Sequence, residues 1–358
     1  MADIFRPHGL AMLVGSQPLQ DHDTALRRVF EYASRIPNWV QLPSNAGEGM
    51  LEQFMLGLPG LVEEGDRCYV DTAAGDFDAQ MLEFFEEYLL LSEQGQGWDQ
   101  SRFVLTPAAA QGFFSLLDAL ASATGEWEAL KGQITGPITF CTGMRDHEKR
   151  AIFYHDSLRE AAVKLLALKA AWQAKMLQKA GSGVPVIIFI DEPALAGYGS
   201  SEFISISREE IDACLREVIA AIHDQGALAG VHVCANTDWS LLFDSEADII
   251  NFDAHGFFDK FILYGDRLKD YFASGRFLAW GLVPTLRVEQ IEAATVDTLW
   301  QEWRAKVDCL VSMGLDCDTI RAQSFITPSC GTGSLTPELG RKVLALTRAL
   351  SRRIRKGA

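Results

Sequence analysis

Residues 185–191 read PVIIFID, and this stretch decides the fold. It is a short apolar run rich in β-branched residues that ends in an acid. A helical pattern precedes it over residues 157–180, with Asp156 as a candidate cap at its start and Gly181 after its end. A β-rich run that alternates with an amphipathic helix in this way indicates an α/β chain.

The same unit recurs along the chain. Further helical patterns cover residues 22–36, 207–225 and 337–353. Eight such units suit a (β/α)8 barrel, which needs about 250 residues. A doubly wound open sheet is the alternative, but the glycine fingerprint it would show after its first strand is missing. Eight strand-like runs are present, at residues 11–16, 39–43, 132–137, 185–191, 227–234, 248–253, 277–283 and 322–330.

One stretch does not fit this regular alternation. Residues 48–130 are too many for one helix. We expect a helical insertion after the second strand, with a further strand at residues 103–106. No linker rich in proline, glycine or serine divides the chain, so we expect one TIM-barrel domain over residues 1–358.

Composition limits the classes of function. The chain has 48 Asp and Glu residues and 32 Lys and Arg residues, so its net charge is −16. This acidic balance argues against nucleic-acid binding. No run approaches the ~20 apolar residues of a membrane span. The seven cysteines show no framework spacing and no targeting segment is visible, so a reduced, cytoplasmic protein is expected.

The strongest chemical signal is GVHVCAN at residues 230–236. His232 and Cys234 are two positions apart on a predicted strand, so both side chains share one face. Cys330 ends the last predicted strand at the same rim, where Asp253 and His255 follow the sixth. One imidazole, two thiolates and one further ligand suit tetrahedral Zn²⁺. By spacing alone, a packed core and a metal site both remain open.

Other strand ends carry weaker signals. Asp191 ends a buried strand, where it could bind a substrate ammonium, act as acid or base, or cap the next helix. The adjacent Glu192 is expected to face the barrel wall. Gly136 permits close backbone approach to a ligand, and Ser16 with nearby amides could hold a carboxylate. A tight turn is the alternative explanation for Ser16.

Taken in this order, the motifs resemble those of the catalytic barrel of cobalamin-independent methionine synthase. Its relatives include the methylcobamide:coenzyme M methyltransferases and uroporphyrinogen decarboxylase. The resemblance covers nearly the whole chain and rests on five motifs: Gly15-Ser16, residues 132–137, residues 190–195, His232-Val233-Cys234 and Pro328-Ser329-Cys330-Gly331.

The resemblance implies a zinc-dependent methyltransferase with a homocysteine-like thiol acceptor. His232, Cys234 and Cys330 would be zinc ligands. The family's fourth ligand is a glutamate, and the matching position here is Asp253, with His255 as an alternative. Ser16 and Asp191 would hold the carboxylate and the ammonium of the acceptor. No catalytic residue beyond the zinc site is expected. Zinc would deprotonate the thiol, because the thiolate is the nucleophile.

Departures from the family bear on the methyl donor. A folate donor needs a proton, which the family supplies from a histidine after the seventh strand. Here that strand end reads GLVPT at residues 281–285. A methyl-corrinoid needs no such proton, so a corrinoid protein or methylcobalamin is the expected donor. The alternatives are a uroporphyrinogen decarboxylase-like enzyme, and a non-catalytic protein that binds zinc or docks a corrinoid partner.

Overall fold

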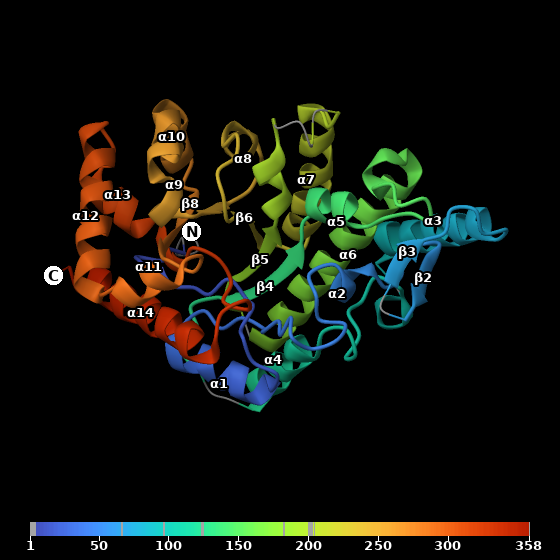
Figure 1. The fold of residues 1–358 in the computed structure, drawn as a ribbon, viewed down its shortest axis with the longest axis horizontal. Helices are drawn as coiled ribbons and strands as arrows, with labels where there is room; N and C mark the ends of the chain where they lie inside the picture. The colour runs from blue at the N-terminus through green and yellow to red at the C-terminus, as the bar shows by residue number, and fades with distance from the viewer. Residues whose placement is uncertain are drawn as a thin grey trace.

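A seven-stranded parallel sheet forms the centre of the molecule (Figure 1). The computed structural model describes residues 5–357 apart from residues 66, 96, 123–124, 182, 200–202 and 204. The strand order is β1-β9-β8-β7-β6-β5-β4. The strands are β1 (Leu10–Ala11), β4 (Leu130–Thr135), β5 (Val186–Asp191), β6 (Leu228–Val233), β7 (Ile249–Phe252), β8 (Phe277–Val283) and β9 (Ser324–Pro328).

The predicted second strand, residues 39–43, lies between the two edge strands without forming a ladder. Ser16 makes a parallel bridge with Gln41 on one side, and Asn38 makes one with Lys131 on the other. Pro37 before this segment and Pro43 at its end have no N–H to donate to a ladder. Six of the eight predicted strands are therefore confirmed, the first shares only Ala11 with the two-residue β1, and the second is replaced by two isolated bridges.

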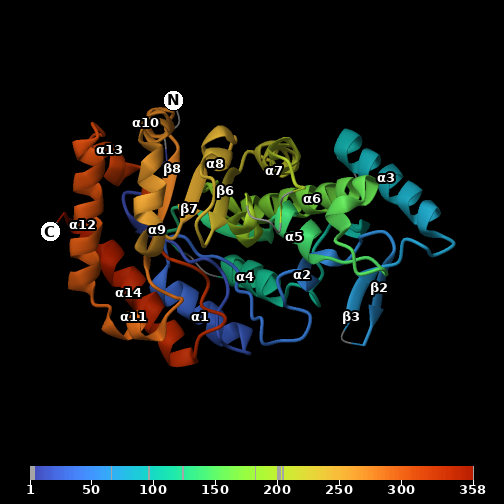
Figure 2. The same ribbon diagram turned by 45° about the horizontal axis from the view of Figure 1, so that its top comes forward.

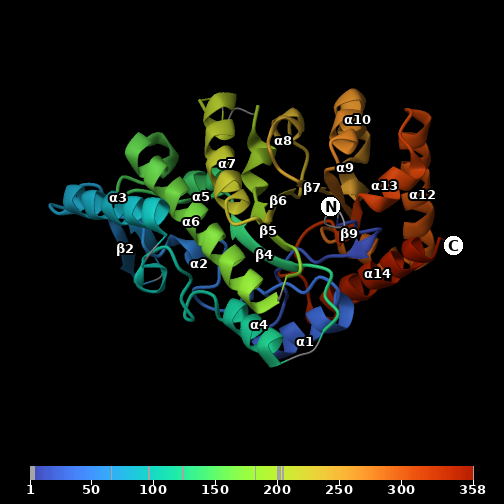
Figure 3. The ribbon, with the colours of Figure 1, turned by 180° about the vertical axis from the view of Figure 1, so that it is seen from behind.

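Helices follow the strands and pack on the outside of the sheet (Figures 1 and 3). All four helices predicted from periodicity are present, as α1 (His22–Tyr32), α6 (Asp156–Gly181), α7 (Arg208–His223) and α14 (Pro337–Lys356). Their starts follow from local chemistry: Ser207 and Glu210 form a capping box for α7, and Thr336 caps α14. The other helices after β4 are α5 (Pro137–Gly143), α8 (Ser240–Asp244), α9 (Ala254–Phe261), α10 (Gly265–Ala273), α11 (Val288–Ala293), α12 (Val296–Ser312) and α13 (Cys317–Ala322).

The stretch that interrupts the alternation holds both helices and an unexpected hairpin. Its elements are α2 (Glu52–Met55), β2 (Leu61–Glu64), β3 (Arg67–Val70), α3 (Phe77–Gln94) and α4 (Gln111–Ser122). In Figure 2, α3 and the hairpin project from the end of the molecule opposite α12. The strand predicted at residues 103–106 is wrong, because this segment is irregular chain between α3 and α4.

The inner face of the sheet changes in character along its strands. The register pairs Asp191 with His232 and His232 with Asn251, so these side chains share the inner face. Nearer the amino ends of the strands, the buried core of this face is apolar and includes Phe189 and Phe325. The inner face is thus packed below and polar above, which puts the chemistry at the carboxyl ends. In the described part of the chain, none of the helices combines the length and apolar character needed to cross a membrane.

Candidate metal centre

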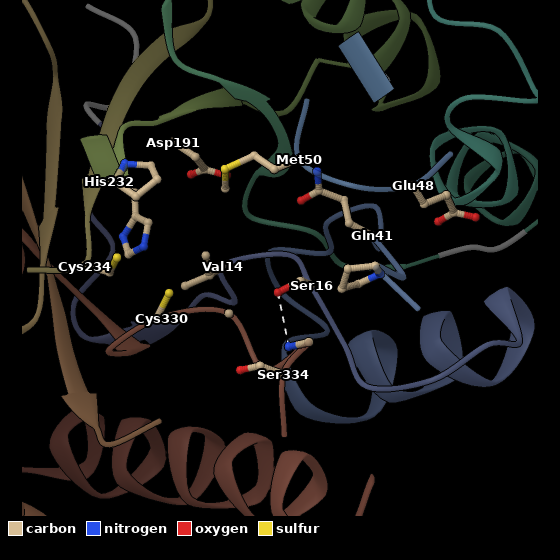
Figure 4. A pocket seen from close by; sticks show the side chains of 14 residues that line it. Val14, Ser16, Gln41, Glu48, Met50, Asp191, His232, Cys234, Cys330 and Ser334 are labelled. Atoms are coloured by element: carbon tan, nitrogen blue, oxygen red, sulfur yellow. Dashed lines mark hydrogen bonds between the residues drawn. The ribbon is translucent and has the colours of Figure 1, made fainter. Parts of the chain in front are cut away.

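Three ligand-type side chains meet at the carboxyl end of the sheet (Figure 4). His232 lies on β6, Cys234 follows directly after this strand, and Cys330 comes two residues after β9. One ligand atom from each, an imidazole nitrogen and two sulfurs, lies within 4.8 Å of the others. The structure therefore brings together three residues that lie up to 98 positions apart in the sequence.

The imidazole of His232 is buried, with the side chains of Cys234 and Asn251 as polar neighbours. Its exposed fraction is 3%, and neither ring nitrogen has a hydrogen-bond partner among the described residues. Leaving a buried polar group unsatisfied costs about 1–3 kcal/mol. A cation bound by one ring nitrogen would remove part of that penalty, and one nitrogen with two sulfurs is a donor set typical of Zn²⁺. The residues present fit a zinc ion.

The two thiols differ in acidity because they lie against each other. Contact with the Cys330 thiol, and then with His232, lowers the pKa of Cys234. The neighbouring Cys234 thiolate and burial together raise the pKa of Cys330. A lowered thiol pKa favours the thiolate, which is the form that binds metal.

Asp191 is an unpaired buried acid beside this cluster. It ends β5, and its Oδ1 has no hydrogen-bond partner among the described residues. Burial raises the pKa of Asp191, while His232 and Lys131 act in the opposite direction. The Nζ atom of Lys131 donates to the Val14 carbonyl at 2.6 Å, below the site. Such a carboxylate is suited to receive a cationic group of a ligand.

A cavity of about 260 Å³ connects the cluster with Asp191. Its walls include Ser16, Gln41 and Met50, in addition to the three metal-type residues. Figure 4 shows these side chains around one space, with His232 and Asp191 at one end and Ser16 opposite. The volume suits a small molecule.

Ser16 and the segment after Cys330 form one compact wall of the cavity. The Ser16 Oγ accepts a hydrogen bond from the Gly333 amide at 3.3 Å. A Cβ atom on Gly331 would lie 2.1 Å from this Oγ, so only glycine allows the approach. Ser16, which was predicted to bind a carboxylate, thus lines the cavity.

Gly136 lies elsewhere. It precedes α5 and does not line the cavity, and a Cβ added there would lie 2.2 Å from the carboxyl carbon of Glu192. Glu192 is fully buried and accepts from the amides of Ile138 and Thr139, both at 2.8 Å. The close approach that glycine permits is therefore to an internal carboxyl group, not to a ligand.

Neither residue considered for the fourth metal ligand lies in the cluster. The Oδ1 atom of Asp253 accepts from the Gly256 amide at 2.8 Å and so caps α9. His255 pairs its Nδ1 with Glu302 at 3.1 Å. Both line a second cavity of about 360 Å³, separate from the first.

Two wall residues, Gln41 and Met50, were not expected at the site. Gln41 lies within the predicted second strand, and the position of that strand end at the carboxyl edge of the sheet was a signal that could have indicated it. Met50 belongs to an irregular loop and is held by its carbonyl, which accepts from Thr135 Oγ1 at 2.6 Å. No local pattern could have indicated it.

Comparison with known proteins gives distant similarity to solved structures alone. Neither a family model nor a curated protein matches the chain. Among solved structures it is similar to a B12-independent methionine synthase from Shewanella sp. in complex with selenomethionine, at 21% identity and a TM-score of 0.48. The match covers 68% of this chain and 67% of the other. Similarity at this level does not assign a family or a function.

Proposed function

We propose that this protein is a zinc-dependent methyltransferase that moves a methyl group to a small thiol acceptor. The observation that carries the proposal is the buried cluster of His232, Cys234 and Cys330, which opens into a cavity containing the unpaired carboxylate of Asp191. Zinc held by these residues would keep the acceptor as a thiolate at neutral pH.

The cavity walls favour an amino-acid-like thiol of the homocysteine class. Asp191 would bind the ammonium group through its unpaired Oδ1, and Ser16 would donate from its hydroxyl to the carboxylate. Coenzyme M has no ammonium group and would leave Asp191 buried and unpaired, which is unfavourable. These two residues would hold the sulfur toward the three ligand side chains.

A methyl-corrinoid, free or carried by a protein, is the proposed donor. Pro284 and Thr285 follow β8, so no histidine stands at this strand end to protonate a folate nitrogen. His255 and Thr285 both line the second cavity, but the ring of His255 is paired with Glu302. A reduced corrinoid leaves without a proton, so this arrangement suits it.

We also propose that residues 38–41 complete an eight-membered (β/α)8 barrel, with residues 48–130 as its insertion in a single domain over 1–358. The two parallel bridges of this segment to Ser16 and Lys131 support that assignment.

Zinc content and methyl transfer test the proposal together. We expect about one zinc per chain in the wild type and little in a Cys234→Ser/Cys330→Ser double variant. A Cys309→Ser/Cys317→Ser variant is the matched control, because both of these cysteines are exposed. Methylcobalamin and a methyl-folate are then offered with homocysteine and with coenzyme M.

The outcomes separate the alternatives. Transfer from methylcobalamin to homocysteine supports the whole proposal. Turnover with the folate would overturn the donor assignment, and zinc without any transfer would favour a zinc-binding or corrinoid-docking protein. Absence of zinc even after reconstitution would refute thiol activation. A uroporphyrinogen decarboxylase-like activity gains no support from the first cavity, whose described walls contain no arginine to bind a polycarboxylate.

A further inference from the structure

Three positive charges gather without carboxylate partners where the β2–β3 hairpin meets the segment after α5. Arg67 lies on β3, and Arg145 and Lys149 lie in the turn that follows α5. None of these three exposed side chains forms an ion pair with a described residue. By contrast, Arg102 in the same insertion pairs with Glu87 at 2.7 Å. Acidic residues outnumber basic ones by 48 to 32 in this chain, so three unpaired cations at one place are unexpected.

Backbone hydrogen bonds tie the two segments together. The Val70 amide donates to the Arg145 carbonyl, and the His147 amide donates to the Val70 carbonyl, both at 2.9 Å. The Oδ1 atom of Asp146 closes the turn by accepting from the Arg150 amide at 2.8 Å. The turn is therefore fixed against the edge of β3, and the backbone positions that carry the three cations are set by the fold.

Two of the cations depart from what their local surroundings favour. Glu64 stands opposite Arg67 in the hairpin register, where opposite charges commonly interact, yet no ion pair joins them. Lys149 has a φ of +67°, in the left-handed region that few residues other than glycine adopt. Conformations of this kind are concentrated at functional positions. Both observations indicate that local stability does not explain where these cations lie.

The three cations line one cavity of about 450 Å³. This volume lies within the range of small-molecule pockets. Tyr69, two positions from Arg67 on β3, and Met144 give the cavity aromatic and apolar walls. Two acids, Glu52 and Asp146, also line it, and one oxygen of Asp146 already accepts from two amides. Cations thus exceed acids in a cavity of an otherwise acidic protein.

We propose that this cavity binds a small polyanion, a molecule with phosphate or carboxylate groups, through Arg67, Arg145 and Lys149. Guanidinium groups hold both kinds of oxyanion by paired, charge-assisted hydrogen bonds, and the lysine ammonium adds a point charge. A ligand with at least two negative charges is required, because it must gain more from three cations than it loses to two acids. None of the metal-type residues lines this cavity, so the inference does not rest on the proposed function.

Inorganic phosphate and tricarballylate serve as probes, because they carry the two kinds of oxyanion and neither is a strong zinc chelator. Calorimetric titration at low salt should show binding of at least one of them, weakened by added NaCl. Arg145→Met removes the charge but not the length of the side chain and should weaken binding at least about tenfold. Arg304→Met is the matched control, because Arg304 lies exposed on α12 without an ion pair to a described residue.

Two further variants complete the test. Arg145→Lys retains the charge and should lose less affinity than Arg145→Met. The Cys234→Ser/Cys330→Ser variant should bind the anions as the wild type does, so this site and the proposed function can fail separately. Binding of only one probe identifies the oxyanion that the site prefers. The inference is overturned if neither probe binds the wild type at millimolar concentration, if Arg145→Met and Arg304→Met lose affinity equally, or if binding disappears in the cysteine variant.

Discussion

Replacing Asp191 by asparagine should separate ligand binding from folding. The variant keeps the shape of the side chain but removes its charge. In the proposed complex this carboxylate accepts one charge-assisted hydrogen bond from the acceptor's ammonium. Such bonds contribute about 1.5–3 kcal/mol, so homocysteine should bind roughly 10- to 150-fold more weakly.

The fold should tolerate this change. Oδ1 of Asp191 has no hydrogen-bond partner among the described residues, so an amide at this position breaks no bond there. Burial raises the pKa of Asp191, which shows that its charged form is disfavoured in the unliganded protein. The urea midpoint of Asp191→Asn should therefore be no lower than that of the wild type.

The neighbouring acid provides the matched control. Glu192 accepts from two amides and from the Thr139 hydroxyl at the start of α5. Glu192→Gln should lower the free energy of unfolding by about 1–3 kcal/mol, because a donor amide then faces other donors. It should not discriminate between thiols with and without an ammonium group.

Calorimetric titration of the zinc-loaded protein with homocysteine and with 3-mercaptopropionate is the assay. Asp191→Asn should weaken binding of the first thiol and leave that of the second within about threefold. Equal loss for both thiols, or no loss for either, would refute the role assigned to Asp191.

Three further predictions follow from buried contacts. Burial lowers the pKa of Lys169 from 10.5 to about 7, so between these values the unfolded chain binds more protons and stability rises with pH. Lys169→Met removes this buried amine together with its hydrogen bond to the Leu56 carbonyl. The net effect should be a gain in the free energy of unfolding of about 1–3 kcal/mol at pH 7 and a smaller gain at pH 9.5. Equal gains at both pH values in urea unfolding would contradict this prediction. Gly331→Ala places a methyl group against Ser16 and should weaken homocysteine binding at least about tenfold, while a variant that binds normally would show that this wall does not contact the thiol. Phe261 stacks on Phe252 with ring centroids 3.9 Å apart, and Phe261→Ala should destabilise the protein by about 3–5 kcal/mol in chemical unfolding without changing zinc content.

Much of the framework was predictable because it depends on local chemistry. Apolar runs such as residues 185–191 are strands because their side chains are buried on both faces of a parallel sheet. Several helices start where a polar side chain caps them, as Ser207 does at α7 and Asp253 at α9. His232 points to the inner face because strand side chains alternate, and Cys234, one residue past the end of β6, meets it there as predicted.

Long-range packing decided the remainder. The β2–β3 hairpin joins strands with little burial, so its sequence shows no continuous apolar run. Residues 39–43 were predicted as a strand from their apolar composition, but Gln41 and the preceding Asn38 make only isolated bridges, to Ser16 and Lys131. Neither outcome is encoded in residues a few positions apart.

The site shows the same division. The sequence alone determined which residue types reach the rim, because strand ends and side-chain alternation are properties of a few adjacent residues. Only the tertiary structure decided that Cys330 meets Cys234 while Asp253 caps α9. A metal site depends on distances of a few ångströms between residues of separate strands. These distances depend on how the whole sheet curves and on which hydrogen-bond partner each side chain has in the fold.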